Sequence, residues 1–225
     1  MHRLVPFVAT FLLASGCGGS SGGGASSTTV APSQALTRGK QINLQAADFP
    51  AGWKTQTVTV NTAADAFAKD LASCLKVTDP SQQAVARVDS DVFSGPTSGV
   101  VSSSVTFLKN ASAARAQLKA LQGASALRCI ETAATAYLNL RLAATGATFS
   151  GAKADKRIVK ALGKDAAAFR FSVNAKLPTQ MVAVYGDVTV ALKGTEQLMT
   201  TFFSIATPFD ETLADDLTAK VLARA

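Results

Sequence analysis

Residues 181–206 read MVAVYGDVTVALKGTEQLMTTFFSIA, two β-branched and aromatic runs separated by a short polar segment. Runs of this composition are typical of β-strands. The glycine-containing segment from Lys193 to Glu196 suits a hairpin, so residues 188–192 should pair antiparallel with the run that follows. Gly186 and Asp187 interrupt the first run, and glycine followed by a polar residue also suits a two-residue turn. The stretch therefore predicts successive hairpins and a mostly antiparallel sheet.

Two segments closer to the N-terminus have the alternation of a half-buried strand. Phe169, Phe171 and Val173 alternate with polar residues. Residues 100–108 read VVSSSVTFL, with apolar residues on one side and most of the hydroxyl residues on the other. A period of two places alternate side chains on opposite faces of a sheet. Both segments are therefore expected to add strands with one apolar face.

Helical periodicity appears between and after these strands. Apolar residues three and four positions apart mark helices within residues 62–76, 112–121 and 127–138. Asp210 can cap a last helix, whose apolar residues Leu213, Leu217 and Val221 recur at spacings of four. We therefore expect an α+β fold in a single domain, with a mostly antiparallel β-sheet flanked by helices.

The first sixteen residues have the three parts of a secretory signal. Arg3 gives the positive start, residues 4–13 form an apolar core, and small residues occupy positions 14–16. The core is too short to cross a bilayer, which takes about 20 residues. Cys17 follows directly, and the stretch resembles the lipobox of bacterial lipoproteins, whose cysteine receives a lipid. We expect residues 1–16 to be a lipoprotein signal peptide and Cys17 to be lipidated; an ordinary secretion signal is the alternative.

The residues after Cys17 are rich in glycine, serine and threonine and have little to bury. Such a sequence behaves as a flexible linker. We expect residues 17–40 to form the lipidated cysteine and its tether, and residues 41–225 to form the folded domain. The protein is then expected on the extracytoplasmic side of the cell membrane, attached through its lipid.

The chain has three cysteines, and lipidation of Cys17 leaves Cys74 and Cys129. Outside the cytoplasm, disulfides form and persist. We therefore expect a disulfide between Cys74 and Cys129 that joins two helices; two buried free thiols are the alternative. A structural zinc site takes four ligands, more cysteines and histidines than the mature chain retains. No metal site is expected.

Residue types that many enzymes need are missing. The only histidine, His2, lies in the expected signal, so the mature chain has no Ser-His-Asp or Cys-His site. The nucleophile-elbow, P-loop and dinucleotide-binding patterns are also absent from the sequence. A glycosidase needs only two carboxylates, and Asp89 and Asp91 could share a strand face, although a solvated surface is the more common place for such residues. The acidic residues within 210–216 suit the start and solvated face of the last helix. We expect no catalytic residues, no cofactor and no enzymatic activity.

Several short motifs occur in a characteristic order: AADFPAGW at 46–53, Cys74 on a helix, DVFSG at 91–95 before the VSSSVTF strand, AARAQL at 113–118 leading to Cys129, LGKDAAAFR at 162–170 and YGDVTV at 185–190. Together they resemble the actinobacterial PknH-like extracellular sensor domains and their lipoprotein relatives. The resemblance covers nearly all of the folded part. It implies an antiparallel sheet flanked by helices, a cleft that receives a ligand, and no catalytic residues. Members near the kinase have four cysteines where this domain has two, and no kinase domain is attached here.

Residues 153–164 hold five basic residues against one acidic residue. As a helix, this segment would place the five on one face, with Ile158 and Leu162 pointing away. One interpretation is a solvated basic face, and the other is binding to anionic lipid headgroups or acidic polymers of the cell envelope. Nucleic acid is not expected as a partner outside the cell. The candidate residues are Lys153, Lys156, Arg157, Lys160 and Lys164.

Two functional hypotheses follow from the sequence. The first is a membrane-tethered, non-enzymatic domain that binds a ligand or a protein partner, as a sensor does. The second is a carrier of a lipid or another apolar ligand in the cell envelope. A large dry cavity between helices and sheet favours the carrier, whereas a shallow polar cleft favours the sensor. The sequence does not identify the ligand or the protein partner.

Overall fold

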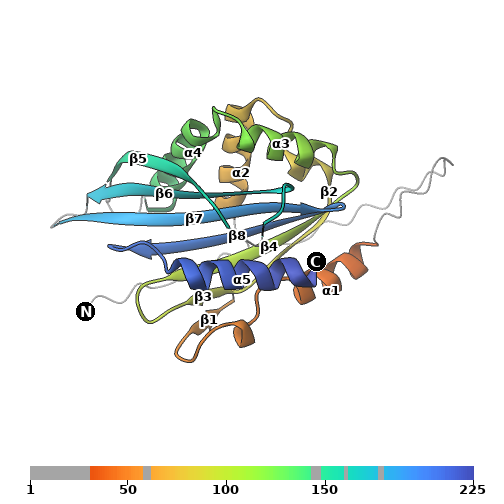
Figure 1. Cartoon of the computed structure of the whole chain (residues 1–225), viewed down its shortest axis with the longest axis horizontal. Coiled ribbons are helices and arrows are strands. Elements are labelled where there is room, and N and C mark those ends of the chain that lie inside the picture. Colours follow the sequence, from red (N-terminus) through yellow and green to blue (C-terminus); the bar gives the residue numbers. More distant parts are fainter. Residues whose placement is uncertain (1–30, 58–61, 143–147, 160–161, 177–179) are drawn as a thin grey trace, which may run out of the picture.

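The computed structural model describes residues 31–57, 62–142, 148–159, 162–176 and 180–225. They form three layers, with one sheet between two groups of helices (Figure 1). Helices α2 (Thr62–Leu75), α3 (Ser112–Gln122) and α4 (Ala126–Leu142) cover one face, and α1 (Pro32–Ile42) and α5 (Glu211–Arg224) cover the other. The expected α+β fold is confirmed. Among the described residues, no helix has both the length and the apolar character needed to cross a membrane.

The sheet of the described chain has eight strands, and all of their pairings are antiparallel. The pairing of Lys193 with Glu196 continues as far as Val184 and Ile205, which confirms the hairpin expected there. Two short 3-10 helices, Ala46–Asp48 and Pro80–Gln83, lie in the connections. The strand order is β1 (Lys54–Gln56), β3 (Val92–Ser94), β4 (Val100–Leu108), β8 (Glu196–Ile205), β7 (Met181–Lys193), β6 (Ala166–Lys176) and β5 (Thr148–Arg157), and β2 (Ala84–Asp89) also pairs with β4.

Alternation along the strands separates two apolar cores, one on each face of the sheet. Phe169, Phe171 and Val173 of β6 pack beneath the helices of the α2–α4 layer. The apolar side of β4 packs on the other face, together with Leu217 and Val221 of α5. The period of two read from the sequence is therefore confirmed. The apolar side of β4 faces α1 and α5. Its hydroxyl side therefore faces the α2–α4 layer on the opposite face of the sheet.

The last helix, α5, is fixed at both of its ends. The Asp210 carboxylate accepts a hydrogen bond from the backbone N–H of Leu213 at 2.9 Å, which confirms the expected N-cap. In the last turn, Arg224 donates to the carboxylate of Asp48 and to the backbone carbonyl of Asn43. Burial raises the pKa of Asp48, but the hydrogen bonds from Arg224 and Gln45 outweigh burial and hold this pKa below its ordinary value.

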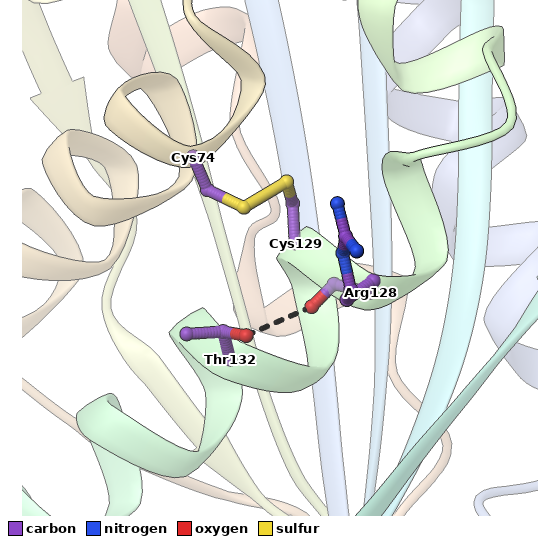
Figure 2. Close-up of a disulfide and its surroundings, with 4 residues drawn as sticks. All are labelled: Cys74, Arg128, Cys129 and Thr132. Atoms are coloured by element: carbon purple, nitrogen blue, oxygen red, sulfur yellow. Dashed lines mark hydrogen bonds between the residues drawn. A yellow bond between two sulfur atoms is a disulfide. The ribbon is translucent and has the colours of Figure 1, made fainter.

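A disulfide joins Cys74 in α2 to Cys129 in α4, which confirms the expected pairing (Figure 2). The two Cα atoms are 5.5 Å apart, and the bridged residues are 55 positions apart in the sequence. A constraint of this length stabilises a fold by about 4 kcal/mol in the chain-entropy model. Phe67 of α2 also packs edge-on against Tyr137 of α4, with ring centroids 6.0 Å apart. Helix α2 is therefore held over the sheet largely through α4.

The turn expected at Gly186 and Asp187 is wrong, because β7 continues without a break through both residues. Gly186 pairs with Phe171 of β6 and with Phe203 of β8. A Cβ atom at Gly186 would lie 2.3 Å from Cζ of the Phe171 ring. The glycine therefore makes room for an aromatic ring that lies across the strand. Glycine inside a strand marks a close approach of this kind as well as a bend or turn.

The folded part begins earlier than the expected boundary at residue 41. Helix α1 starts at Pro32, inside the segment 17–40 that was expected to be linker, and it buries Ala35, Gly39 and Ile42. Proline suits the first turn of a helix, because its φ angle is already helical and the missing N–H has no partner there. Residues 1–30 lie outside the described residues, and with them the expected signal peptide and Cys17.

Gly186→Ala tests the close contact with the Phe171 ring. The added methyl group has no room unless the ring moves, and overpacking of a core costs about 1–3 kcal/mol. We expect a lower urea midpoint of unfolding with an unchanged slope. Gly163→Ala is the control, because a Cβ atom there meets nothing within 4 Å. A Gly186→Ala protein as stable as the parent would contradict this account of β7.

Candidate functional site

The main concave site of the described residues lies between α2 and the sheet. It consists of two pockets, which we call the aliphatic chamber and the aromatic pocket. They adjoin, because Phe67, Arg87, Ser104, Val188 and Met199 line both. The aliphatic chamber has a volume of about 460 Å³. Together the two pockets form the cleft.

The floor of the cleft changes from polar to apolar across the sheet. Residues paired across neighbouring strands share a face, so the strand register orders the floor. On β2 and β4 the floor is polar, with Arg87, Ser102, Ser104 and Thr106. On β7 and β6 it is apolar, with Val188, Val190 and Phe169. A ligand lying across the strands therefore meets hydrogen-bonding groups at one end and apolar side chains at the other.

The aliphatic chamber spans both halves of this floor, from Ser104 and Thr106 to Phe169 and Val190, beneath mainly apolar walls. Its walls include Leu71 of α2, Leu121 of α3 and Ile130 of α4, all of which are buried. Its polar side chains are partly engaged with neighbours. Gln197 donates to Gln117 at 2.9 Å, and the Asp79 carboxylate accepts from the backbone N–H of Ser81 at 2.9 Å. The chamber is suited to hold an apolar group away from water.

Four aromatic rings form one wall of the aromatic pocket. Tyr137 stacks on Phe203 with 10° between the ring planes, and their centroids are 6.0 Å apart. Phe203 meets Phe171 edge-on, and Phe67 meets Tyr137 edge-on, each at 6.0 Å. Five serine and threonine residues line the same pocket: Ser90, Ser102, Ser103, Ser104 and Thr201. Flat apolar surfaces and hydroxyl groups are therefore combined in one small site.

Arg87 and Asp89 form an ion pair at the rim of the aromatic pocket. Both Nε and Nη2 of Arg87 lie 2.9 Å from Oδ1 of Asp89, and the side chains are 24% and 39% exposed. Asp89 ends β2, and Asp91 lies beyond that strand. The two carboxylates therefore do not share one strand face, contrary to the arrangement considered for a glycosidase. No group of three metal-ligating side chains occurs among the residues that the structure describes.

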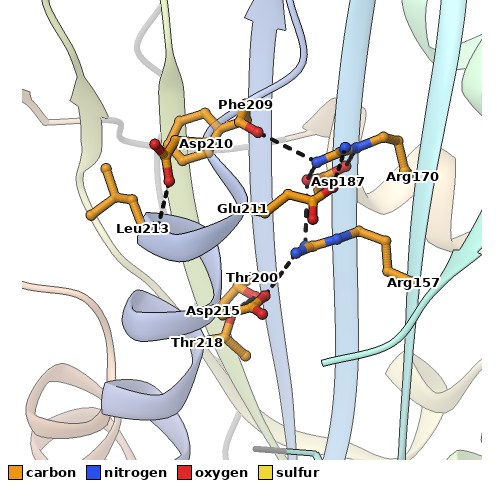
Figure 3. Close-up of polar contacts among 10 residues, drawn as sticks. All are labelled: Arg157, Arg170, Asp187, Thr200, Phe209, Asp210, Glu211, Leu213, Asp215 and Thr218. Carbon is orange, nitrogen blue, oxygen red and sulfur yellow. Dashed lines mark hydrogen bonds and ion pairs between the residues drawn. The ribbon is translucent and has the colours of Figure 1, made fainter. Parts of the chain in front are cut away.

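A second polar cluster lies on the opposite face of the sheet, against α5 (Figure 3). Asp187 is 1% exposed, and each of its carboxylate oxygens accepts a hydrogen bond from Arg170 at 2.7 Å. Arg170 also pairs with Glu211 at 2.6 Å. Arg157, with an 8% exposed side chain, lies 3.4 Å from Asp187 and 2.7 Å from Asp215.

The charges of this cluster are directed toward one another. The hydrogen bond with Asp187 raises the pKa of Arg170, and the negative charges of Asp187 and Glu211 raise it further against the opposite effect of burial. Glu211, 65% exposed in the first turn of α5, and Asp215, 35% exposed, keep the solvent contact expected for them, and both also pair with arginines of the sheet. The cluster fixes α5 to β5, β6 and β7.

The basic segment does not form the helical face expected for residues 153–164. Residues up to Arg157 belong to β5, where Lys153 and Arg157 share one face and Lys156 lies on the other. Arg157 is buried in the ion-pair cluster, and Ile158, expected to point away from a helical basic face, is 92% exposed on the chain after β5. The β-sheet pairing of this segment overrides its helical charge pattern. Lys160 lies outside the described residues, and Lys153, Lys156 and Lys164 are exposed.

No protein-family model and no curated protein matches the chain. Among solved structures, the chain is similar to the extracellular domain of PknH from Mycobacterium tuberculosis, with 9% sequence identity and a TM-score of 0.43. The alignment covers 84% of this chain and 95% of that domain. Membership of the PknH-like family stays a prediction.

Sequence reasoning missed most of the cleft. Ser102, Ser104 and Thr201 come from strands far apart in the sequence and meet only in the sheet, where the hydroxyls of Ser102 and Thr201 are 2.7 Å apart. The signal available in advance was the hydroxyl side of the 100–108 strand, which suggested a solvated face. Small hydroxyl side chains opposite aromatic rings also leave space, and that space is the aromatic pocket.

Binding of anionic surfaces by the basic segment stays a prediction, now limited to its exposed lysines. We expect the lipid-free domain to sediment with anionic vesicles at low salt. Each lysine near such a surface contributes about 1 kcal/mol, and the attraction decays over about 8 Å at physiological salt. Lys153 and Lys156 lie on opposite faces of β5, so not all three lysines meet one flat surface at once. Changing Lys153, Lys156 and Lys164 together to Gln should therefore weaken sedimentation roughly tenfold.

The control for this prediction changes Lys109, Lys119 and Lys193 together to Gln, which removes the same charge from exposed positions elsewhere. Arg157 is kept in both proteins, because its loss would disturb the buried ion-pair cluster. An equal loss of binding in the two triple variants would show that only net charge matters and would rule out a specific basic surface.

Proposed function

We propose that the chain is an extracytoplasmic lipoprotein, anchored through Cys17, whose domain binds a ligand without converting it chemically. The apolar run that ends at Cys17 and the glycine- and serine-rich residues before α1 support the anchor. The Cys74–Cys129 disulfide supports an oxidising compartment, where such bonds persist. A flexible tether from Cys17 to Pro32 would span roughly 20 Å and keep the domain close to the membrane.

The cleft is the single observation that carries the binding function. Its larger part, of about 460 Å³, falls within the range of roughly 300–1,000 Å³ typical of small-molecule sites. Such sites are mainly apolar with a few placed polar groups. The cleft has this composition, since apolar chamber walls adjoin the hydroxyl groups of Ser102 and Thr201.

The cleft supports binding rather than catalysis. Its rim charges, Arg87 and Asp89, are paired with each other, and the chain has no histidine after His2. Histidine is the most common general acid or base in enzyme sites. Besides Arg87, the ionisable side chains that line the chamber are Lys69 and Asp79, and Asp79 caps a short helix through Ser81.

Carriage of an apolar ligand is a second candidate function, and the aliphatic chamber favours it. A carrier must shield the apolar part of its cargo from water between two membranes or sites. Leu121 and Ile130 on the helices, above Phe169 and Val190 on the sheet, provide walls of that kind. A sensor that recognises an apolar ligand needs the same chamber, so binding of the ligand is the step common to both functions.

Cys17→Ala tests the anchor. Without a thiol to receive lipid, the protein should be lost from the membrane fraction or accumulate with its signal peptide attached. Membrane fractionation with mass determination of the N-terminus measures both results. Normal processing together with full membrane retention of Cys17→Ala would contradict lipid anchoring at this residue.

Binding in the cleft is tested with Nile red, an uncharged dye whose fluorescence rises in apolar surroundings. We expect the domain to bind the dye, and we expect Met199→Trp to lose most of this signal because Met199 lies where the two pockets join. Met181→Trp is the matched control, since Met181 is 60% exposed and lines neither pocket. Equal fluorescence with all three proteins, or no binding by the parent, would contradict the proposed site.

A further inference from the structure

We propose that the cleft binds a single-chain amphiphile with an uncharged, hydroxyl-bearing head group, an inference that rests on the proposed function of the cleft. The head group lies in the aromatic pocket and the chain lies in the aliphatic chamber. Monoacylglycerols and single-chain glycolipids share this chemistry. Three features of the cleft support this ligand: the order of the floor residues, the composition of each pocket and the balance of charge at the rim.

The floor of each pocket is polar on β4 and apolar on β7, so both pockets offer an amphiphile hydroxyl groups and apolar side chains. Ser104 on β4 pairs with Met199 on β8, and Met199 pairs with Val190 on β7. In the next row, Ser102, Thr201 and Val188 follow in the same order. Each row runs from a hydroxyl group to an apolar side chain. A molecule with one polar end and one apolar end matches both rows, and one that is polar or apolar throughout matches only half of each.

The aliphatic chamber fits the chain of such a molecule. It continues from the floor beneath the helices, where Leu121 is 1% exposed and Ile130 is 2% exposed. Removal of apolar surface from water is the main favourable contribution to this kind of binding, and it needs no directional contacts. The chamber and the aromatic pocket share Phe67, Val188 and Met199 as lining, and we place the two ends of one ligand in these adjoining pockets.

The aromatic pocket, with a volume of about 70 Å³, has the chemistry to hold a small head group with hydroxyls, or part of a larger one that projects from it. Glycerol and sugar rings have C–H surfaces and hydroxyl groups on the same small frame. The rings of Tyr137 and Phe203 offer flat surfaces to the C–H groups of the ligand. The hydroxyls of Ser102 and Ser104 can donate hydrogen bonds to its hydroxyl groups or accept hydrogen bonds from them. Arg87 adds N–H donors and Asp89 adds acceptor oxygens at the rim.

The charges lining the cleft oppose a charged head group. The described lining holds two basic residues, Lys69 and Arg87, and two acidic residues, Asp79 and Asp89. A carboxylate placed at Arg87 would lie beside Asp89, and an ammonium placed at Asp89 would lie beside Arg87. A charge taken from water without a free partner binds unfavourably. An uncharged head group avoids that cost and still uses the donors and acceptors of both side chains.

The test compares four probes with the same twelve-carbon chain length: dodecyl glucoside, monolaurin, laurate and dodecyltrimethylammonium. Each displaces Nile red from the domain, below its micelle concentration. We expect the glucoside or monolaurin to displace the dye at about tenfold lower concentration than either charged probe. The charged probes should bind more weakly because a charged head group cannot pair with all the donors and acceptors of the site. The tighter of the two uncharged probes identifies a sugar or a glycerol head.

Three results would overturn the inference. Tightest binding of laurate or of the ammonium would show that the site selects a charge. Equal binding of all four would show that the head group is not recognised. Failure of all four to displace bound Nile red would exclude the amphiphile and leave the proposed binding function intact, whereas failure of Nile red itself to bind counts against that function.

Asp89→Ala provides a second test, because it removes acceptor oxygens and leaves the charge of Arg87 without this carboxylate. We expect dodecyl glucoside to bind about fivefold more weakly and laurate to bind more tightly than to the parent. Asp216→Ala is the control; Asp216 is exposed on α5, against the other face of the sheet, and its loss removes the same charge. Unchanged probe preference in a folded Asp89→Ala protein, checked by its urea midpoint, would contradict the assigned head-group position.

Discussion

The position of α2 over the sheet is the constraint on which the cleft depends. Helix α2 forms the outer wall of both pockets through Phe67, and its attachment runs mainly to α4, by the Cys74–Cys129 disulfide and the contact of Phe67 with Tyr137. Without this link, Val188 and Met199 would lie on an open sheet face. Apolar side chains bind a ligand weakly there, because water reaches the side chains and the ligand alike. The disulfide thus has two effects: it restricts the unfolded chain, and it keeps a gap between helix and sheet at a fixed width.

The two faces of the sheet differ in how completely they are filled. On the α5 face, Asp187 meets Arg170 and Arg157, and these in turn meet Glu211 and Asp215, so the buried charges are paired. Loss of one member of such a set is strongly destabilising, because it leaves a buried charge without a partner. On the other face, small residues on β4 lie opposite aromatic rings, and the difference in size leaves room for a ligand. One face holds the layers together, and the other keeps the space in which we propose binding.

The parts of this structure that could be predicted from the sequence depend on local signals. The Lys193–Glu196 hairpin, the Asp210 cap and the periodic helices each need only neighbouring residues, and the disulfide followed from the number of cysteines left after Cys17. The errors arose where a distant residue decides the outcome. Gly186 suggested a turn because its reason, the Phe171 ring, comes from another strand. Residues 153–157 have a helical charge pattern, but pairing with β6 makes them a strand. The cleft was missed for the same reason, since its floor combines side chains from five strands.

The central claim, that an amphiphile occupies the cleft between α2 and the sheet, can be tested through two methionine methyl groups. Within residues 32–225 the chain has Met181, which is exposed at the start of β7, and Met199, which lies where the two pockets join. Carbon-13 methyl spectra of this domain, recorded during titration with monolaurin carrying a nitroxide on its chain, report on both positions at once. The account predicts strong broadening of the Met199 methyl signal at concentrations that leave Met181 unchanged. Broadening of Met181 alone, or of both signals equally, would contradict binding in the cleft.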